Sequence, residues 1–261
     1  MLPLILGAAL DLLTPVQEPT HSLAATQPSP GNFFSKSKLI LDTWSDGATD
    51  GKAWTLMESF VTGISPGFAL GFDAALTDRG VHDTSGMEDL RSWLSWRFLQ
   101  RDLGPVDTQR AALIAGLTLP TGAESLTRDE VTPSVGGAFT DIRGRRGINL
   151  AAAWEFHQEA GAQPLYPGEA GADHLRVDAA WLWRLIPAAY GPDYRAAHYF
   201  ELEARLDYET NGDRELRLAP GWLLEAPLFA VEASLELPVS SSLETRPERS
   251  YSLVLGLRFL F

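Results

Sequence analysis

The last eleven residues, 251–261 (YSLVLGLRFLF), alternate between two faces with a period of two, the period of a β-strand. One face is wholly apolar, with aromatic side chains at both ends: Tyr251, Leu253, Leu255, Leu257, Phe259 and Phe261. An exposed apolar strand at the edge of a soluble sheet invites aggregation, whereas a membrane barrel needs such an outward face. The segment therefore favours a transmembrane β-barrel over the last strand of a soluble β-sandwich, which stays open as the alternative.

The composition is compatible with a membrane barrel. The 261 residues suit one barrel, and no run of eighteen apolar residues exists that would span a bilayer as a helix. The chain has no cysteine, which suits an exported protein but also fits others. A net charge of -13 argues against nucleic acid as a partner. Eight tryptophans are many for this length, and tryptophan is enriched at membrane interfaces.

Alternating segments separated by Gly, Pro, Asn and Asp predict an all-β fold, an antiparallel up-and-down transmembrane β-barrel of about twelve strands. The predicted strands cover residues 34–44, 53–62, 67–77, 88–99, 109–118, 134–142, 148–157, 174–185, 199–208, 215–224, 228–238 and 251–261. An even number suits a closed single-chain bacterial barrel, in which long outer loops alternate with short turns. The longer connection PAAYGPDYRA (187–196) departs from this alternation.

The N-terminal residues predict export. Residues 1–24 fit a signal peptide, with an apolar run followed by the small residues Ser22 and Ala24 at a cleavage spacing. Residues 25–32 are then a linker, and residues 33–261 form the outer-membrane barrel. Two features disagree with a signal peptide: no Lys or Arg precedes Lys36, and Asp11 interrupts the apolar run. The alternative is a short buried or disordered N-terminal segment.

Several short motifs occur in an order that resembles one family. They are Gly86-Met87-Glu88-Asp89-Leu90, Leu119-Pro120-Thr121-Gly122, Pro220-Gly221, Leu237-Pro238-Val239 and Gly256-Leu257-Arg258-Phe259. Over roughly residues 50–261 the order and spacing are similar to those of the outer-membrane proteins of the MetA pathway of phenol degradation. The resemblance implies a barrel that passes hydrophobic or aromatic compounds. The acidic balance and the signal without basic residues depart from the family.

The last strand also resembles the C-terminal signal strand of bacterial outer-membrane barrels, which ends in an aromatic residue. The resemblance implies a location in the bacterial cell outer membrane and recognition by the barrel assembly machinery through the strand from Tyr251 to Phe261. The expected partners are then outer-membrane lipid, lipopolysaccharide and a small hydrophobic solute. Acidic residues in the predicted outer loops suggest divalent cations shared with lipopolysaccharide, although solubility explains them as well: Asp78, Asp83, Glu124, Asp129, Glu130, Glu159, Glu169 and Asp173.

If the apolar strand faces point to lipid, the opposite faces line the lumen, because a charge at mid-depth on the lipid face costs about 2–4 kcal/mol for Arg or Lys. The lumen-lining candidates are Asp73, Arg91, Trp93, Arg97, Arg110, Arg176, Asp178, Arg184, Tyr199, Glu201, Glu203, Arg205, Arg217, Glu232 and Arg258. Both signs of charge are present, so many should pair across strands. They form either a polar conduit or structural ion pairs that fill a narrow barrel.

The sequence contains no motif that indicates catalysis, a cofactor or a metal ion, and we therefore do not expect the protein to be an enzyme. Among the histidines, His157 is the one expected well inside a strand, and no G-x-S-x-G context accompanies it. Three functions are therefore weighed. The first is a channel or transporter for small, hydrophobic or aromatic molecules by passive diffusion. The second is a structural barrel that transports nothing, and the third is a barrel enzyme that modifies lipid.

Overall fold

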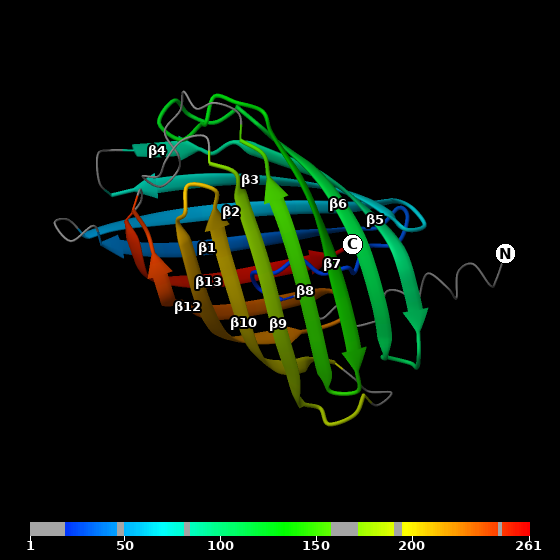
Figure 1. Ribbon diagram of the computed structural model, residues 1–261. Helices are drawn as coiled ribbons and strands as arrows, with labels where there is room; N and C mark the ends of the chain where they lie inside the picture. The colour runs from blue at the N-terminus through cyan, green and yellow to red at the C-terminus, as the bar shows by residue number, and fades with distance from the viewer. Residues whose placement is uncertain (1–18, 46–49, 81–83, 158–171, 191–194, 245–246) are drawn as a thin grey trace.

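The computed structural model describes residues 19–45, 50–80, 84–157, 172–190, 195–244 and 247–261. Their regular structure is entirely β-strand (Figure 1). No helix in the described part of the chain is long and apolar enough to cross a membrane. The strands are β1 (Phe33–Ser45), β2 (Asp50–Ser65), β3 (Phe68–Arg79), β4 (Thr84–Met87), β5 (Leu90–Asp102), β6 (Thr108–Leu119), β7 (Thr132–Arg143), β8 (Arg146–Glu155), β9 (His174–Ile186), β10 (Ala197–Glu209), β11 (Arg214–Glu225), β12 (Phe229–Ser242) and β13 (Glu248–Leu260).

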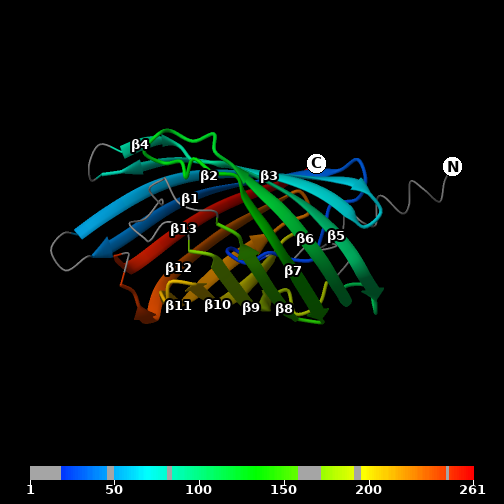
Figure 2. The same cartoon turned by 45° about the horizontal axis from the view of Figure 1, so that its top comes forward.

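The sheet closes on itself because β1 pairs with β2 on one side and with β13 on the other. The paired strands are all antiparallel, and neighbours in the sheet are neighbours in the chain except at this seam and where β3 pairs with β5. Figures 1 and 2 show the closure where the blue strand β1 lies beside the red strand β13. Closure leaves the long strands without an unpaired edge, which is what a sheet in lipid requires. The predicted antiparallel barrel of twelve strands is confirmed.

One additional strand interrupts the simple pattern. β4 pairs with the C-terminal part of β3, at residues 76–79, and β5 pairs with the N-terminal part, at residues 68–73. Glu88 and Asp89 separate the two strands. The sequence predicted a single strand over 88–99, and the structure instead starts β5 at Leu90 and adds β4 before it.

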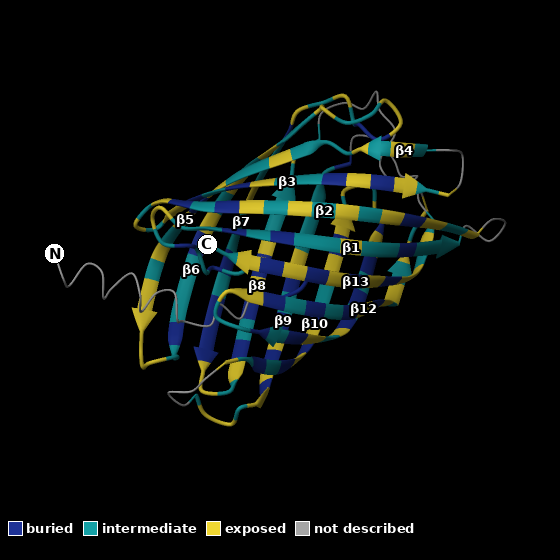
Figure 3. Cartoon of the chain, turned by 180° about the vertical axis from the view of Figure 1, so that it is seen from behind, coloured by how far each residue is buried: buried dark blue, intermediate teal, exposed yellow. Residues whose placement is uncertain are grey.

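The two faces of the sheet have opposite chemistry. Apolar side chains on β13 point outward and are exposed, as shown by Leu253, Leu255 and Leu257. Polar and charged side chains on the same strand, such as Ser252 and Arg258, point inward and are buried. The alternating bands of yellow and blue in Figure 3 repeat this pattern along the strands. A soluble protein buries its apolar face, so this reversed arrangement suits a sheet surrounded by lipid.

Aromatic residues gather on the outward face. Phe33 lies 4.9 Å from Phe261 and 5.1 Å from Phe60, measured between ring centroids. Trp181 and Trp183 stack at 6.0 Å on β9. Aromatic rings at such positions are typical of the boundary between lipid and water.

The two ends of the barrel differ in their connections. The end that holds the C-terminus, here called the turn end, carries residues 66–67, 103–107, 144–145, 187–196 and 226–228. The opposite end, here called the loop end, includes the long connections 120–131 and 156–173. The acidic candidates at the loop end include Asp78, Glu124 and Asp173, whereas Asp83, Glu159 and Glu169 lie outside the described residues.

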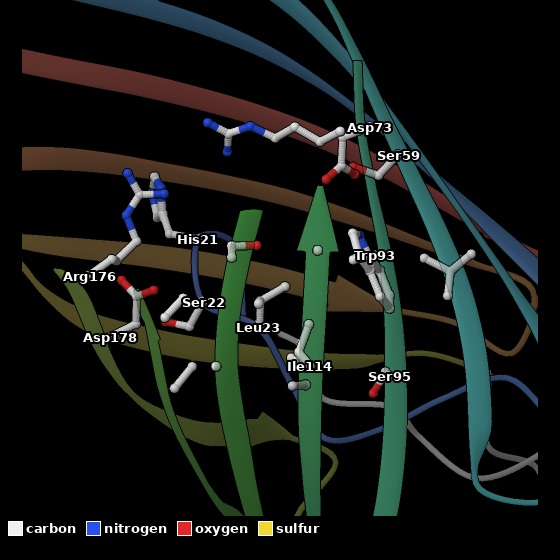
Figure 4. Close-up of a pocket in the computed structure, with 18 of the residues that line it drawn as sticks. His21, Ser22, Leu23, Ser59, Asp73, Trp93, Ser95, Ile114, Arg176 and Asp178 are labelled. Atoms are coloured by element: carbon white, nitrogen blue, oxygen red, sulfur yellow. The ribbon is translucent and has the colours of Figure 1, made fainter. Parts of the chain in front are cut away.

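The segment before β1 lies inside the barrel rather than outside it. Residues 19–32, here called the N-terminal segment, include Thr20 and Ala25, which are completely buried, and Ser22, which is nearly so. In Figure 4 this blue segment crosses behind the cavity. The sequence predicts the end of a signal peptide and a linker for these residues, with a short buried or disordered N-terminal segment as the alternative. Residues 1–18 lie outside the described part of the chain.

Candidate binding cavity in the barrel lumen

One side of the lumen is filled with ion pairs. Arg217 on β11 contacts Asp207 on β10 and places Nη1 2.5 Å from Glu236 Oε1 on β12. Arg205 donates from Nε to Asp178 Oδ1 at 2.7 Å. These groups are largely buried, and several carboxylates surround each guanidinium, which offsets the cost of removing the charges from water. The wall formed by β9 to β13 is therefore packed with polar groups.

The other side of the lumen is lined by small residues. Gly116 on β6, Gly136 on β7 and Ala151 on β8 lie on the inward face there. Because these side chains are small, they leave a cavity of about 230 Å³ between this wall and the N-terminal segment. The cavity is large enough for a small organic molecule, since a 150 Å³ cavity holds benzene.

Two carboxylates on β10 hold the beginning of the N-terminal segment. The Thr20 N–H donates to Glu201 Oε1 at 2.8 Å, and the His21 N–H donates to Glu203 Oε1 at 2.9 Å. Ser22 donates to Glu203 Oε2 from its backbone N–H at 2.8 Å and from its hydroxyl at 2.6 Å. Hydrogen bonds to a charged acceptor are roughly twice as strong as neutral ones, so the three hydrogen bonds to Glu203 fix this backbone firmly.

Cations complete the attachment of the same residues. Lys36 Nζ donates to the carbonyl oxygens of Pro19 at 3.1 Å and Thr20 at 3.3 Å. Arg205 Nη2 donates to the His21 carbonyl oxygen at 3.0 Å. The backbone of the N-terminal segment thus satisfies its donors and acceptors with charged groups of the barrel wall.

The segment then crosses the lumen to the opposite wall. The Ala25 N–H donates to Thr140 Oγ1 at 3.0 Å, and Gln27 Nε2 lies 2.5 Å from Ser95 Oγ. Pro30 forms a β-bridge with Gly63 on β2. A Cβ at Gly63 would lie 2.4 Å from the Ser29 carbonyl oxygen, so only glycine lets the two backbones approach so closely. The segment is an internal plug attached to both walls.

Cleavage after Ala24 stays a prediction. A chain cut there would lose Thr20, His21 and Ser22, which make the contacts with Glu201 and Glu203.

The cavity has a charged part and an apolar part (Figure 4). Arg91, Glu155 and Arg176 belong to the charged part, which faces the loop end, and Arg91 Nη2 lies 4.0 Å from Glu155 Oε1. Further towards the turn end, the lining includes Trp93, Ile114 and Leu23 of the N-terminal segment. Leu23 is 39 % exposed although it lies inside the barrel, because its side chain projects into the cavity.

The structure divides the fifteen predicted lumen residues among three places. Six line the cavity: Asp73, Arg91, Trp93, Arg176, Asp178 and Arg205. Seven are buried in the interior away from it: Arg184, Tyr199, Glu201, Glu203, Arg217, Glu232 and Arg258. Arg97 and Arg110 lie nearer the turn end, on β5 and β6. The residues missed by sequence reasoning are those of the N-terminal segment, because no strand pattern marks them.

The structure places His157 differently from the sequence-based prediction. His157 lies just beyond β8, which ends at Glu155, so its predicted position inside a strand is wrong. Its Nδ1 is 3.0 Å from Glu130 Oε1 and 2.9 Å from Arg128 Nη1, which ties together two loop-end connections. Burial lowers the pKa of His157, and the nearby Arg128 guanidinium lowers it further.

His21 approaches a serine that is distant in the sequence. Its Nε2 lies 2.7 Å from Ser234 Oγ on β12, and its Nδ1 lies 3.7 Å from Glu236 Oε2. The three residue types are those of a hydrolase triad, but 3.7 Å is beyond hydrogen-bond distance. Ser234 is also buried and is not part of the cavity lining, so a substrate in the cavity does not reach it. In the described part of the chain, no group of three or more His, Asp or Glu side chains is arranged to hold a metal ion.

Comparison with known proteins identifies the fold. No protein-family model matches the sequence, and no curated protein sequence matches it either. The structure is similar to the "COG4313 outer membrane channel" from Pseudomonas putida F1, with a TM-score of 0.60 and 12 % identity over 90 % of this chain and 97 % of that chain. The NanC porin gives a TM-score of 0.48 at 10 % identity over 85 % of this chain and 98 % of that one. LpxR from Salmonella typhimurium gives 0.47 at 10 % identity over 88 % and 100 %.

Proposed function

We propose that this protein lies in a bacterial outer membrane and lets small, hydrophobic or aromatic molecules diffuse through its lumen. The observation that carries the proposal is a closed barrel that is apolar outside and polar inside, with a cavity of about 230 Å³ next to its plug. The barrel of Pseudomonas putida F1 that shares the fold is an outer membrane channel, which supports the same location and role here. The ordered motifs that resemble the MetA-pathway family support an aromatic or hydrophobic solute.

The plug determines how such a conduit works. The N-terminal segment contacts β10 on one wall and β2 on the other, so it narrows the lumen between them. A solute therefore passes beside the segment, through the cavity on the side of the small residues, or passes when the segment shifts. The ion-paired wall is packed, so the space for passage lies along the opposite wall.

A second function has its own supporting observation. The buried ion pairs and the plug together fill much of the lumen, as they would in a structural barrel that transports nothing. Filled lumens are known for small barrels, and open ones for large barrels, so strand number alone does not decide between the two. The lipid-modifying enzyme has no such support, because Ser234 is inaccessible from the cavity.

Replacement of Gly63 by alanine tests the conduit. A Cβ at Gly63 would lie 2.4–2.5 Å from the backbone oxygens of Ser29 and Pro28, so the variant must push the plug away from β2. We expect a several-fold rise in single-channel conductance, and faster entry of a small aromatic alcohol into lipopolysaccharide-containing vesicles. The matched control is Gly80→Ala, whose Cβ would make only ordinary contacts, at 3.7 Å or more, with Lys52.

The same measurements separate the two functions. Conductance and solute entry that increase in Gly63→Ala but not in Gly80→Ala support the conduit. If the original protein and the folded Gly63→Ala variant both leave the vesicles as closed as protein-free ones, the structural barrel is the correct description.

A further inference from the structure

We propose that the lumen cavity binds an amphipathic organic anion, with its carboxylate at Arg91 and Arg176 and its apolar body between Trp93 and Leu23. The proposal deepens the proposed function, because it names the solute class that would occupy the conduit. It rests on that function only for transport, since binding can be measured on a barrel that conducts nothing.

The charge of the lining favours an anion. Five cationic side chains line the cavity, Lys36, Lys38, Arg91, Arg176 and Arg205, against the three anionic side chains Asp73, Glu155 and Asp178. The lining is therefore net positive by two charges, although the whole chain carries -13. Carboxylates outside the lining offset part of this excess, because Lys36 lies 3.2 Å from Glu232, Arg176 3.0 Å from Asp207 and Arg205 3.7 Å from Glu236. The lining therefore favours negative charge at its exposed guanidinium groups.

Two of these arginines have donors directed at the cavity. The Arg91 and Arg176 side chains are 45 % and 33 % exposed, whereas that of Arg217 in the ion-paired wall is only 3 % exposed. Arg176 donates to Asp207 from Nε, at 3.0 Å, and Arg91 comes no closer to Glu155 than 4.0 Å. Each guanidinium has five N–H donors, so both retain donors for a carboxylate at the cavity.

The apolar part of the cavity has a flat wall. A Cβ at Gly71 would fall 2.1 Å from the Trp93 ring, so glycine is what allows this indole to lie against the backbone of β3. The ring also borders the cavity, opposite the exposed side chain of Leu23 (Figure 4). A ring system inserted between them would stack on the indole and bury its apolar surface.

The position of the charged groups along the barrel orients the ligand. Arg91 and Trp93 are successive inward residues of β5, and Arg91 is the one nearer the loop end. Arg176 pairs with Ala153 across β8 and β9, which brings it to the same part of the cavity as Glu155. The carboxylate therefore faces the loop end and the rings face the turn end. A volume of about 230 Å³ suits an acid of one or two aromatic rings.

Three naphthalene probes of similar size test the assignment. The full chain, folded in a non-ionic detergent, is titrated with 2-naphthoate, 2-naphthylmethanol and 2-naphthylmethylamine in equilibrium dialysis. We expect the anion to bind at least tenfold more tightly than the alcohol, and the amine most weakly, because a hydrogen bond to a charged group contributes more than a neutral one. Equal affinities for the anion and the alcohol would overturn the proposal.

Variants locate the site. Arg91→Gln and Arg176→Gln should each weaken binding of 2-naphthoate about tenfold and leave 2-naphthylmethanol unchanged. Arg146→Gln, which removes an exposed arginine outside the cavity, should change neither. Leu23→Trp should fill the apolar part and reduce binding of all three probes while both arginines remain. Unaltered naphthoate binding in folded Leu23→Trp or in both glutamine variants would refute the site. Binding without any conductance would leave this site intact and refute the conduit.

Discussion

At the scale of the residue, His157 shows how one side chain joins separate loops. Its ring contacts Arg128 and Glu130, and its backbone N–H donates to Asp173 Oδ1 at 3.0 Å. The side chain is 1 % exposed. The buried imidazole of His157 therefore links residues 120–131 to the first residues after β8 at the loop end.

This arrangement predicts a pH dependence. Burial and Arg128 hold the pKa of His157 below its ordinary value of 6.5, whereas Glu130 and Glu155 act in the opposite direction. Protonation is thus easier in the unfolded chain, so the stabilisation by the neutral ring is present above pH 6.5 and is lost as the pH falls below it. After correction for the intrinsic exchange rate, which itself falls with pH, the protection factors of the amides in residues 120–131 should be lower at pH 5.5 than at pH 7.5.

Two variants assign the effect to His157. His157→Gln should reduce the difference between the two pH values, because glutamine does not titrate. His174→Gln is the control, since His174 Nδ1 lies 3.8 Å from Glu155 and could titrate nearby. An undiminished pH difference in His157→Gln would show that the neighbouring carboxylates or His174 cause it.

At the scale of the element, alternation places apolar side chains on the outward face of each long strand, and β2 has a charged residue on that face. Glu58 lies on the outward face of β2 between the exposed side chains of Leu56 and Phe60. It accepts a hydrogen bond from Ser37 Oγ on β1 at 2.5 Å. A carboxylate in an otherwise apolar band is costly in lipid, even with one hydrogen bond.

Opposite substitutions on two strands test this view of the outward face. Glu58→Leu should raise the free energy of unfolding in lipid vesicles by up to about 2 kcal/mol, and Leu255→Arg on β13 should lower it by about 2–4 kcal/mol. Guanidinium-induced unfolding measured by tryptophan fluorescence gives both values. A loss of stability in Glu58→Leu would mean that the contact with Ser37 outweighs the cost of the charge.

At the scale of the whole molecule, the reversed distribution of polar and apolar side chains needs lipid or detergent for stability. The barrel closes through pairing of β1 with β13, and its exposed apolar side chains surround it. Exposure of this apolar surface to water would cost a free energy of about 25 cal/mol for each Å². The fold is therefore stable only when an apolar solvent covers the outer face.

Gel mobility tests this requirement directly. Refolded, unboiled protein should migrate differently from boiled protein in a detergent gel, and β-type circular dichroism should develop only when detergent or lipid is present. Protein that folds in plain buffer and migrates identically after boiling would contradict a membrane barrel. The protein would then be a soluble β-protein, and the proposed transport function would be wrong as well.

The sequence alone determined the class of fold and the side of each strand. Alternation is a local property, because consecutive residues of a strand point to opposite faces wherever the strand lies. The apolar face from Tyr251 to Phe261 and the number of barrel strands were therefore readable from the sequence. So was the inward parity of charged residues such as Arg176 and Arg205.

Only the tertiary structure decided what the lumen contains. The contact of Thr20 with Glu201 joins residues 181 positions apart, and no periodic pattern marks residues 19–32. The same holds for the gap that separates Arg91 from Glu155, since the two lie on different strands. Local alternation along a strand specifies whether a side chain points into the lumen or outward. Which residues that side chain contacts depends on closure of the sheet, because closure brings distant strands and the N-terminal segment together.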